Sequence, residues 1–76
     1  MVKVYSTESC PYCTMVKRFL DSNNVEYENI NVGEDREKAQ EMIDKSGQMG
    51  VPVVDINGTI IIGYDKNKIL AALKGA

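Results

Sequence analysis

The chain has 76 residues, of which 43% are hydrophobic and 26% charged, and its formal net charge is −2 at pH 7. This length predicts one domain over residues 1–76, and the acidic balance argues against a nucleic-acid partner, because phosphate binding needs a basic surface. No apolar stretch approaches the ~20 residues of a membrane helix, and the first one breaks at Ser6, so we expect neither a membrane span nor a signal peptide. The absence of histidine excludes His-based acid–base catalysis and His-ligated metals.

The first half of the chain predicts a strand, a helix and a second strand. Val2–Tyr5 alternates apolar and polar residues, as a short strand does, and a polar loop follows it. From Pro11 the pattern becomes helical, because a proline suits the first helical turn and apolar residues then recur at helix spacing. Those residues are Met15, Val16, Phe19 and Leu20. Tyr27–Val32 predicts the second strand, which Gly33 ends.

The second half predicts a helix, a hairpin and a last helix. Acidic residues at 34–35 suit a helix N-terminus, and the apolar stripe that follows ends at Ser46-Gly47. Val53–Ile56 and Thr59–Ile62 are β-branched runs around Asn57-Gly58, a strong hairpin signal. Asp65 is predicted to cap a final helix that ends at Gly75. The core-facing residues expected in these two helices are Ala39, Met42, Ile43, Ile69, Leu70 and Leu73.

The resulting order, β-α-β-α-β-β-α, predicts an α/β fold in which three helices cover a four-stranded mixed sheet. We expect the first two strands to be parallel neighbours joined by a right-handed crossover, and the hairpin to add an antiparallel pair. Two methionines outside the first helix, Met42 and Met49, are expected to fill gaps in the core.

The two cysteines, Cys10 and Cys13, need an explanation other than stability. A disulfide across two intervening residues closes a very small loop and restricts the unfolded chain little. Their number and spacing therefore indicate a reducing, cytoplasmic setting and a site that uses the thiols. Stability must come from the apolar core.

Chemistry is predicted where the loop before Pro11 enters the helix. Cys10 falls at the helix N-terminus, where free N–H groups and the helix dipole favour a thiolate, and Lys17 adds positive charge. A thiolate attacks disulfides, so Cys10 is predicted to form a mixed disulfide with the substrate. Cys13, deeper in the helix, is expected to stay protonated until it attacks Cys10 and releases the reduced substrate.

Three other interpretations of the cysteine pair stay open at this point. Cys10 and Cys13 could form half of a tetrahedral zinc site, which needs two more ligands from a second chain. They could hold an iron–sulfur cluster between two chains. They could also be buried and inert, which the polar loop 6–9 disfavours. We expect a monomer without metal.

The sequence resembles the glutaredoxin family over nearly its whole length. The matching segments are Val4–Ser6, Cys-Pro-Tyr-Cys at 10–13, Gly50–Val54, Asn57-Gly58 and Ile62–Asp65. The resemblance implies a thioredoxin-like fold and a thiol-disulfide oxidoreductase that uses glutathione as reductant and co-substrate. It also implies that Cys10 is the nucleophile and Cys13 the resolving thiol. The implied partners are glutathione and proteins that carry a disulfide or a glutathione mixed disulfide.

The same resemblance implies a glutathione site. Its expected residues are Pro11, Tyr12, Val51, Pro52, Gly63, Tyr64 and Asp65. The Val51–Pro52 peptide bond is expected to be cis and to pair with an extended substrate segment. The Gly63–Asp65 turn is expected to hold the γ-glutamyl end, with Asp65 near its ammonium group. Pro11 would restrain the geometry of the dithiol and Tyr12 would pack beside the bound thiol, although capping for Asp65 and simple exposure for Tyr12 remain alternatives.

Departures from the family pattern leave the electron donor open. Glu8 stands in the loop where many glutaredoxins carry a lysine, and its charge opposes thiolate formation and repels the carboxylates of glutathione. Gly50 replaces a common threonine, and the turn at 62–66 also differs. Lys66 or Lys45 could supply the missing positive charge. The alternative is a small redoxin that thioredoxin reductase reduces and that donates electrons to ribonucleotide reductase.

Overall fold

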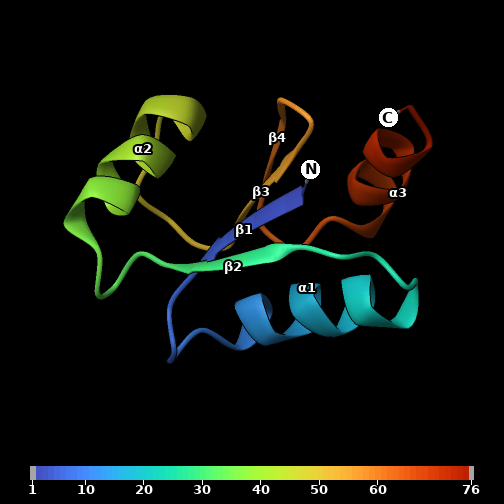
Figure 1. Cartoon of the computed structure of the whole chain (residues 1–76), viewed down its shortest axis with the longest axis horizontal. Helices are drawn as coiled ribbons and strands as arrows, with labels where there is room; N and C mark the ends of the chain where they lie inside the picture. Colours follow the sequence, from blue (N-terminus) through green and yellow to red (C-terminus); the bar gives the residue numbers. More distant parts are fainter. Residues whose placement is uncertain (1, 76) are drawn as a thin grey trace.

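Four strands and three helices make up the part of the chain described by the computed structural model, residues 2–75. They are β1 (Val2–Ser6), α1 (Pro11–Ser22), β2 (Glu28–Asn31), α2 (Arg36–Ser46), β3 (Val53–Ile56), β4 (Thr59–Ile62) and α3 (Lys66–Gly75). The strands form one mixed sheet in the order β2-β1-β3-β4 (Figure 1). β1 runs parallel to β2 and antiparallel to β3, which pairs antiparallel with β4. The predicted fold class, element order and strand pairing are confirmed, and β2 is shorter than expected.

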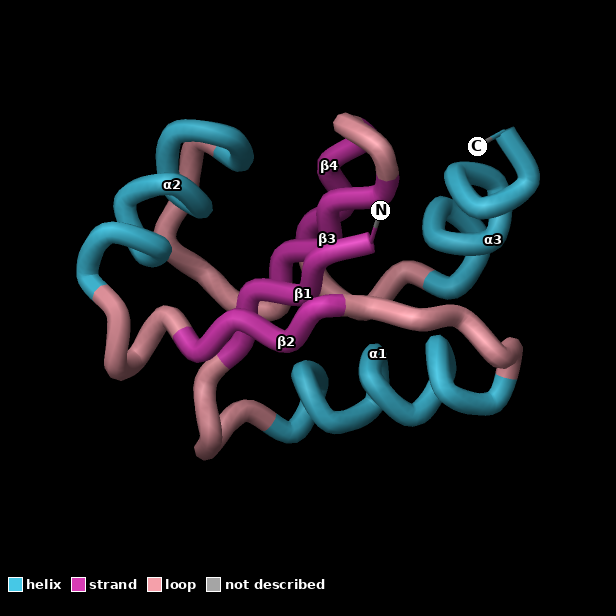
Figure 2. The backbone as a smooth tube through the Cα atoms, in the orientation of Figure 1, coloured by secondary structure: helices cyan, strands magenta, loops and turns pink. Residues whose placement is uncertain are grey.

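The helices divide between the two faces of the sheet (Figure 2). Alternate residues of each strand point to opposite faces, so Val54 packs with α1 and α3 while Val53 packs with α2. The larger core lies under α1 and α3 and contains fully buried Val16, Leu20 and Ile69. It holds α1, the helix that Cys10 caps and that contains Cys13, against the sheet.

Local sequence signals account for most element ends. Asp35 caps α2, because its carboxylate accepts a hydrogen bond from the Lys38 N–H at 3.1 Å. Gly47 ends that helix with φ +74°, a conformation that glycine adopts without strain. The Asn57-Gly58 turn has φ +50° and +97°, as a tight hairpin requires. No helix among residues 2–75 is both long enough and apolar enough to span a bilayer.

Of the two methionines expected to fill the core, only one does so. Met42 is buried as expected, but Met49 is 78% exposed in the loop after α2, and Met15 is 43% exposed on α1. Met49 belongs to no helix or strand, so no element turns it toward a core. Met15 lies at the edge of the apolar stripe of α1, whose central residues Val16 and Leu20 are buried in the core.

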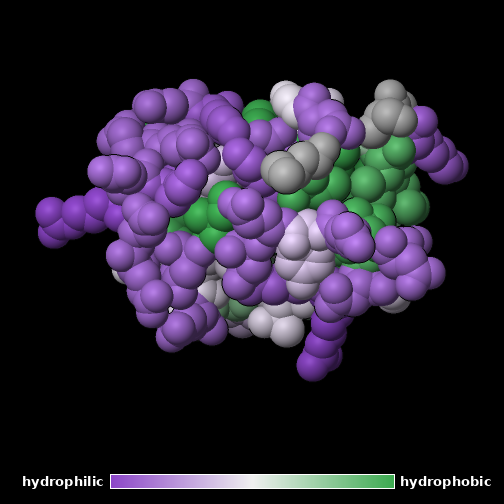
Figure 3. Space-filling model, in the orientation of Figure 1, coloured by the Kyte–Doolittle hydropathy of each residue, from purple (hydrophilic) through white to green (hydrophobic). Residues whose placement is uncertain are grey.

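In the surface view, polar residues cover the α2 side and apolar residues gather over α3 (Figure 3).

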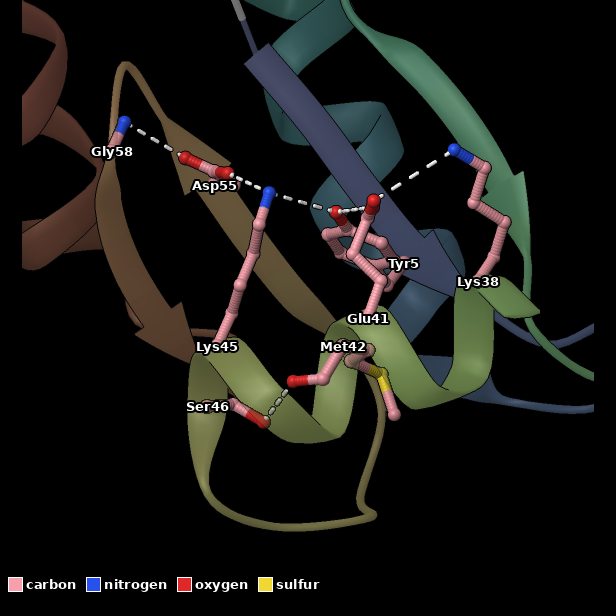
Figure 4. Close-up of polar contacts among 8 residues, drawn as sticks. All are labelled: Tyr5, Lys38, Glu41, Met42, Lys45, Ser46, Asp55 and Gly58. Atoms are coloured by element: carbon pink, nitrogen blue, oxygen red, sulfur yellow. Dashed lines mark hydrogen bonds and ion pairs between the residues drawn. The ribbon is translucent and has the colours of Figure 1, made fainter. Parts of the chain in front are cut away.

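A polar network ties α2 to the sheet (Figure 4). Lys45 Nζ lies 2.8 Å from Asp55 Oδ2 and 3.2 Å from the Tyr5 hydroxyl, which donates a hydrogen bond to Glu41 at 2.5 Å. Burial alone would raise the pKa of Asp55. The hydrogen bonds from Lys45 and the Gly58 N–H and the nearby lysine charges outweigh it, so this pKa lies below its usual value. The pKa of Lys45 is raised mainly by its hydrogen bond to Asp55.

Candidate active site

Cys10 is the N-cap of α1. Its backbone is extended, with φ −95° and ψ 112°, and Pro11 occupies the first helical turn. The Cys10 Sγ accepts a hydrogen bond from the Cys13 N–H at 3.3 Å, and the Cys10 carbonyl accepts one from the Thr14 N–H at 3.3 Å. The half-buried sulfur therefore lies at a helix N-terminus, where the Cys13 N–H and the helix dipole stabilise negative charge.

Cys13 lies one turn further along α1 and is only 1% exposed. Burial, together with its hydrogen bond and charge interaction with Cys10, raises the pKa of Cys13 to about 11. A hydrogen bond from the Thr7 backbone and the charge of Lys17 act in the opposite direction. The two thiols are thus differentiated by position: one reaches the surface, and the other is held protonated beneath it.

The loop before β3 forms the second wall of the site. The Cys10 Sγ lies 3.8 Å from the Val51 carbonyl oxygen, within reach of a weak S–H···O hydrogen bond. The Val51–Pro52 peptide bond is cis, as the family resemblance implied, and Pro52 is buried. The Pro52 carbonyl in turn accepts a hydrogen bond from the Gly63 N–H at 2.9 Å. Three segments far apart in the sequence are thereby joined.

The turn at Gly63 places the start of α3 beside this wall. Gly63 has φ +81°, a left-handed conformation that disfavours a side chain. Asp65 caps α3, because its carboxylate accepts from the Lys68 N–H at 3.1 Å and its carbonyl from the Ile69 N–H at 3.0 Å. The predicted capping role is confirmed, and the turn brings a second helix N-terminus close to Pro52.

The two aromatic residues that the family resemblance assigns to the glutathione site have different surroundings: one is exposed to solvent and the other packs between two helices. Tyr12 is 60% exposed, on the first turn of α1. Tyr64 packs edge-to-face against Phe19 of α1, with ring centroids 6.3 Å apart. Its ring therefore lies between α1 and α3, and only its backbone belongs to the turn.

Of the two lysines proposed to replace the missing positive charge, one is engaged elsewhere. Lys45 of α2 forms an ion pair with Asp55 of β3, so the expectation that it serves the thiol site is wrong. Lys66 lies at the start of α3, with its Nζ 5.7 Å from the centre of the Tyr64 ring. Glu8 is exposed in the loop that leads to Cys10.

Two backbone contacts of the thiols were missed, although Val51 itself was expected at the site. The Val51 carbonyl contacts Cys10, and Thr7 interacts with Cys13 through its main chain. Residue type carries no signal for such contacts, and only the topology, with β1 and β3 adjacent, could have indicated them. Among residues 2–75, no group of three or more His, Cys, Asp or Glu side chains is arranged to hold a metal ion.

Comparisons with known proteins agree with this geometry. The glutaredoxin family model matches residues 2–61. An uncharacterized glutaredoxin-like 8.6 kDa protein from Clostridium pasteurianum is 44% identical over 69 residues, or 91% of this chain and 92% of that protein. Glutaredoxin 3 of Escherichia coli K12 is 35% identical over 74 residues, covering 97% and 89%. The structure of a glutaredoxin from Archaeoglobus fulgidus is 26% identical, with a TM-score of 0.89 over 97% of this chain and 86% of that one. With its cysteine pair at the start of a helix in this fold, the chain belongs to the glutaredoxin family.

Proposed function

We propose that the protein is a glutathione-dependent thiol-disulfide oxidoreductase of the cytoplasm. It would reduce protein disulfides and glutathione mixed disulfides, with Cys10 as nucleophile and Cys13 as resolving thiol. The observation that carries the proposal is the position of the Cys10 sulfur, which lies at a helix N-cap, accepts the Cys13 N–H and borders the Val51 carbonyl. Membership of the glutaredoxin family supports the thiol chemistry.

In the first step the Cys10 thiolate attacks one sulfur of the substrate disulfide. A new S–S bond joins Cys10 to that half of the substrate, the old S–S bond breaks, and the other half leaves as a thiolate that takes a proton from water. Cys10 performs this step because it is partly exposed, whereas Cys13 is buried. The amides at the start of α1 stabilise the charge that the sulfur carries before the attack.

In the second step Cys13 attacks the Cys10 sulfur. Once Cys10 is in a mixed disulfide it carries no charge, and two of the causes that raise the pKa of Cys13 disappear. The hydrogen bond from Thr7 and the charge of Lys17 remain and favour the thiolate. Cys13 then loses its proton, forms a disulfide with Cys10 and releases the bound substrate half as a thiol. The deprotonation is thus coupled to formation of the intermediate.

Regeneration requires a reductant, and we assign this role to glutathione. Two glutathione molecules reduce the Cys10–Cys13 disulfide to the dithiol and leave as glutathione disulfide, so two electrons pass in each cycle. Val51 and Pro52, with the Gly63-Tyr64-Asp65 turn, are the residues we assign to the bound tripeptide. The start of α3 suits its γ-glutamyl carboxylate, since helix N-terminal N–H groups bind anions. Pro11 and Tyr12 border the thiol from α1.

A comparison of electron donors tests this proposal. We expect the protein to reduce a glutathionylated peptide with NADPH, glutathione and glutathione reductase, and to turn over slowly with NADPH and thioredoxin reductase. The opposite result would assign the protein to the reductase-dependent redoxins. The exposed Glu8 beside the site is the feature that favours that second candidate.

Variants of the two cysteines test their roles within the same assay. Cys10→Ser is expected to abolish turnover on every substrate. Cys13→Ser is expected to keep activity on glutathionylated peptides, because one thiol suffices to take up glutathione and a second glutathione releases it. Equal loss in both variants on a glutathionylated peptide would contradict the assignment.

A further inference from the structure

A groove between α1 and α3 lies outside the thiol site. It has a volume of about 370 Å³. Its floor is aromatic, because the rings of Phe19 and Tyr64 meet there edge-to-face. The residues that line it are Met15, Arg18, Phe19, Ser22, Tyr64 and Lys66.

The charge of the groove is opposite to that of the chain. Its lining includes two basic side chains and no acidic one, although the chain has a net charge of −2. The acidic residues nearest in sequence are engaged: Asp65 caps α3, and Asp21 interacts with the Tyr27 hydroxyl next to β2. An exposed Met15 beside the aromatic floor adds apolar surface. The groove therefore fits a segment that combines an apolar side chain with a carboxylate.

The groove also begins next to the reactive thiol. Tyr64 follows Gly63, which is hydrogen-bonded to Pro52, and Met15 lies on the second turn of the helix that Cys10 caps. Arg18 is eight residues beyond Cys10, so it lies about 12 Å further along the helix axis at 1.5 Å per residue. An extended chain covers that length with about four residues.

We propose that this α1–α3 groove binds an acidic segment of the protein substrate that flanks its reactive cysteine. The inference rests on the proposed function and adds a class of substrate to it. An apolar side chain of the segment would lie on Phe19 and Tyr64, and a carboxylate about four residues from the substrate cysteine would pair with Arg18 or Lys66. The bound segment would hold the substrate disulfide at Cys10 for attack.

Matched peptides test the groove. Two peptides carry one central cysteine in a mixed disulfide with glutathione and a leucine on each side. One peptide has glutamate four residues from the cysteine on both sides, and the other has lysine there. Bis(2-hydroxyethyl) disulfide serves as a small uncharged reference substrate. For the wild type we expect the kcat/KM of the glutamate peptide to exceed that of the lysine peptide by about tenfold, the scale of an exposed ion pair replaced by a repulsive one.

Two charge-reversal variants locate the effect. Arg18→Glu is expected to lower the ratio of glutamate-peptide to lysine-peptide kcat/KM to about one or below, by the same reasoning. Lys74→Glu makes the same change in net charge near the end of α3, outside the groove, and should keep the wild-type ratio. The ratio is unaffected by a general loss of activity. If Arg18→Glu keeps the wild-type ratio, or Lys74→Glu loses it as fully, the groove assignment is wrong.

A binding experiment separates this inference from the proposed function. A glutamate peptide with serine in place of cysteine is titrated into the ¹⁵N-labelled wild-type protein. Shifts of the Met15, Arg18 and Tyr64 amides would support the groove even if no disulfide were reduced. Reduction of every substrate at the same rate, with no shift at these amides, would overturn the groove and leave the proposed function standing.

Discussion

The protonation of Cys13 gives a quantitative prediction, because the surroundings of this thiol raise its pKa to about 11. A thiol with a pKa of about 11 is ionised in about one molecule in 10,000 at pH 7, whereas a free cysteine with a pKa of ~8.5 is ionised in about three in 100. The buried thiol should thus be about 300 times less ionised than a free cysteine at this pH. Two of the causes come from Cys10, so replacing Cys10 should lower the pKa of Cys13.

The assay is an NMR titration of the ¹³Cβ shift of Cys13 in the reduced protein. We expect a midpoint near pH 11 in the wild type and a lower midpoint in Cys10→Ser. Cys13 carrying the label in an unfolded control peptide should titrate near pH ~8.5. A wild-type midpoint at the value of the unfolded control, or a higher midpoint in Cys10→Ser, would refute the proposed coupling between the two thiols.

Three further variants test the ion pair between α2 and β3, the loop before Cys10 and the Gly63 turn. Asp55→Asn removes the ion pair with Lys45, which is one-third exposed, so urea unfolding should show a loss of about 2 kcal/mol, below the cost for a fully buried pair. Since folding lowers the pKa of Asp55, the ion pair stabilises the wild type above pH ~4, and this contribution is lost as the pH falls further. An Asp55→Asn variant as stable as the wild type at neutral pH would contradict a stabilising role for the pair. Glu8→Lys should lower the KM for glutathione about threefold in the coupled assay, because it replaces a repulsive charge with an attractive one. An increase in this KM would show that the carboxylates of glutathione do not bind near the loop. Gly63→Ala should destabilise by about 1 kcal/mol through its positive φ and also weaken glutathione binding, whereas Gly47→Ala, with a similar φ, should only destabilise; equal KM changes in both would argue against a glutathione site at the turn.

Much of the fold could be predicted because short-range signals agree with one another. Pro11 begins α1, Asp35 and Asp65 cap the next two helices, and the Asn57-Gly58 turn sets the register of the hairpin. Each signal acts within a few residues. The position of Cys10 at the helix N-terminus follows from the same kind of information, since it precedes the helix that Pro11 begins.

What could not be predicted depends on contacts between distant segments. Lys45 and Asp55 belong to different elements, and only their packing under α2 shows that Lys45 is engaged. The direction of the Tyr64 ring depends on Phe19, 45 residues earlier, because the two rings pack edge-to-face at the floor of the α1–α3 groove. Met49 was expected in the core from its residue type alone, and its loop leaves it exposed. Composition and periodicity say nothing about such pairings.

Trapping the mixed disulfide tests the central proposal most directly. Cys13→Ser is mixed with glutathione disulfide, mapped by mass spectrometry and compared with the free variant by amide NMR. We predict one glutathione, attached to Cys10, with shifts at Val51, Gly63 and Asp65. Attachment of no glutathione, or shifts confined to segments away from these three residues, would contradict the proposal.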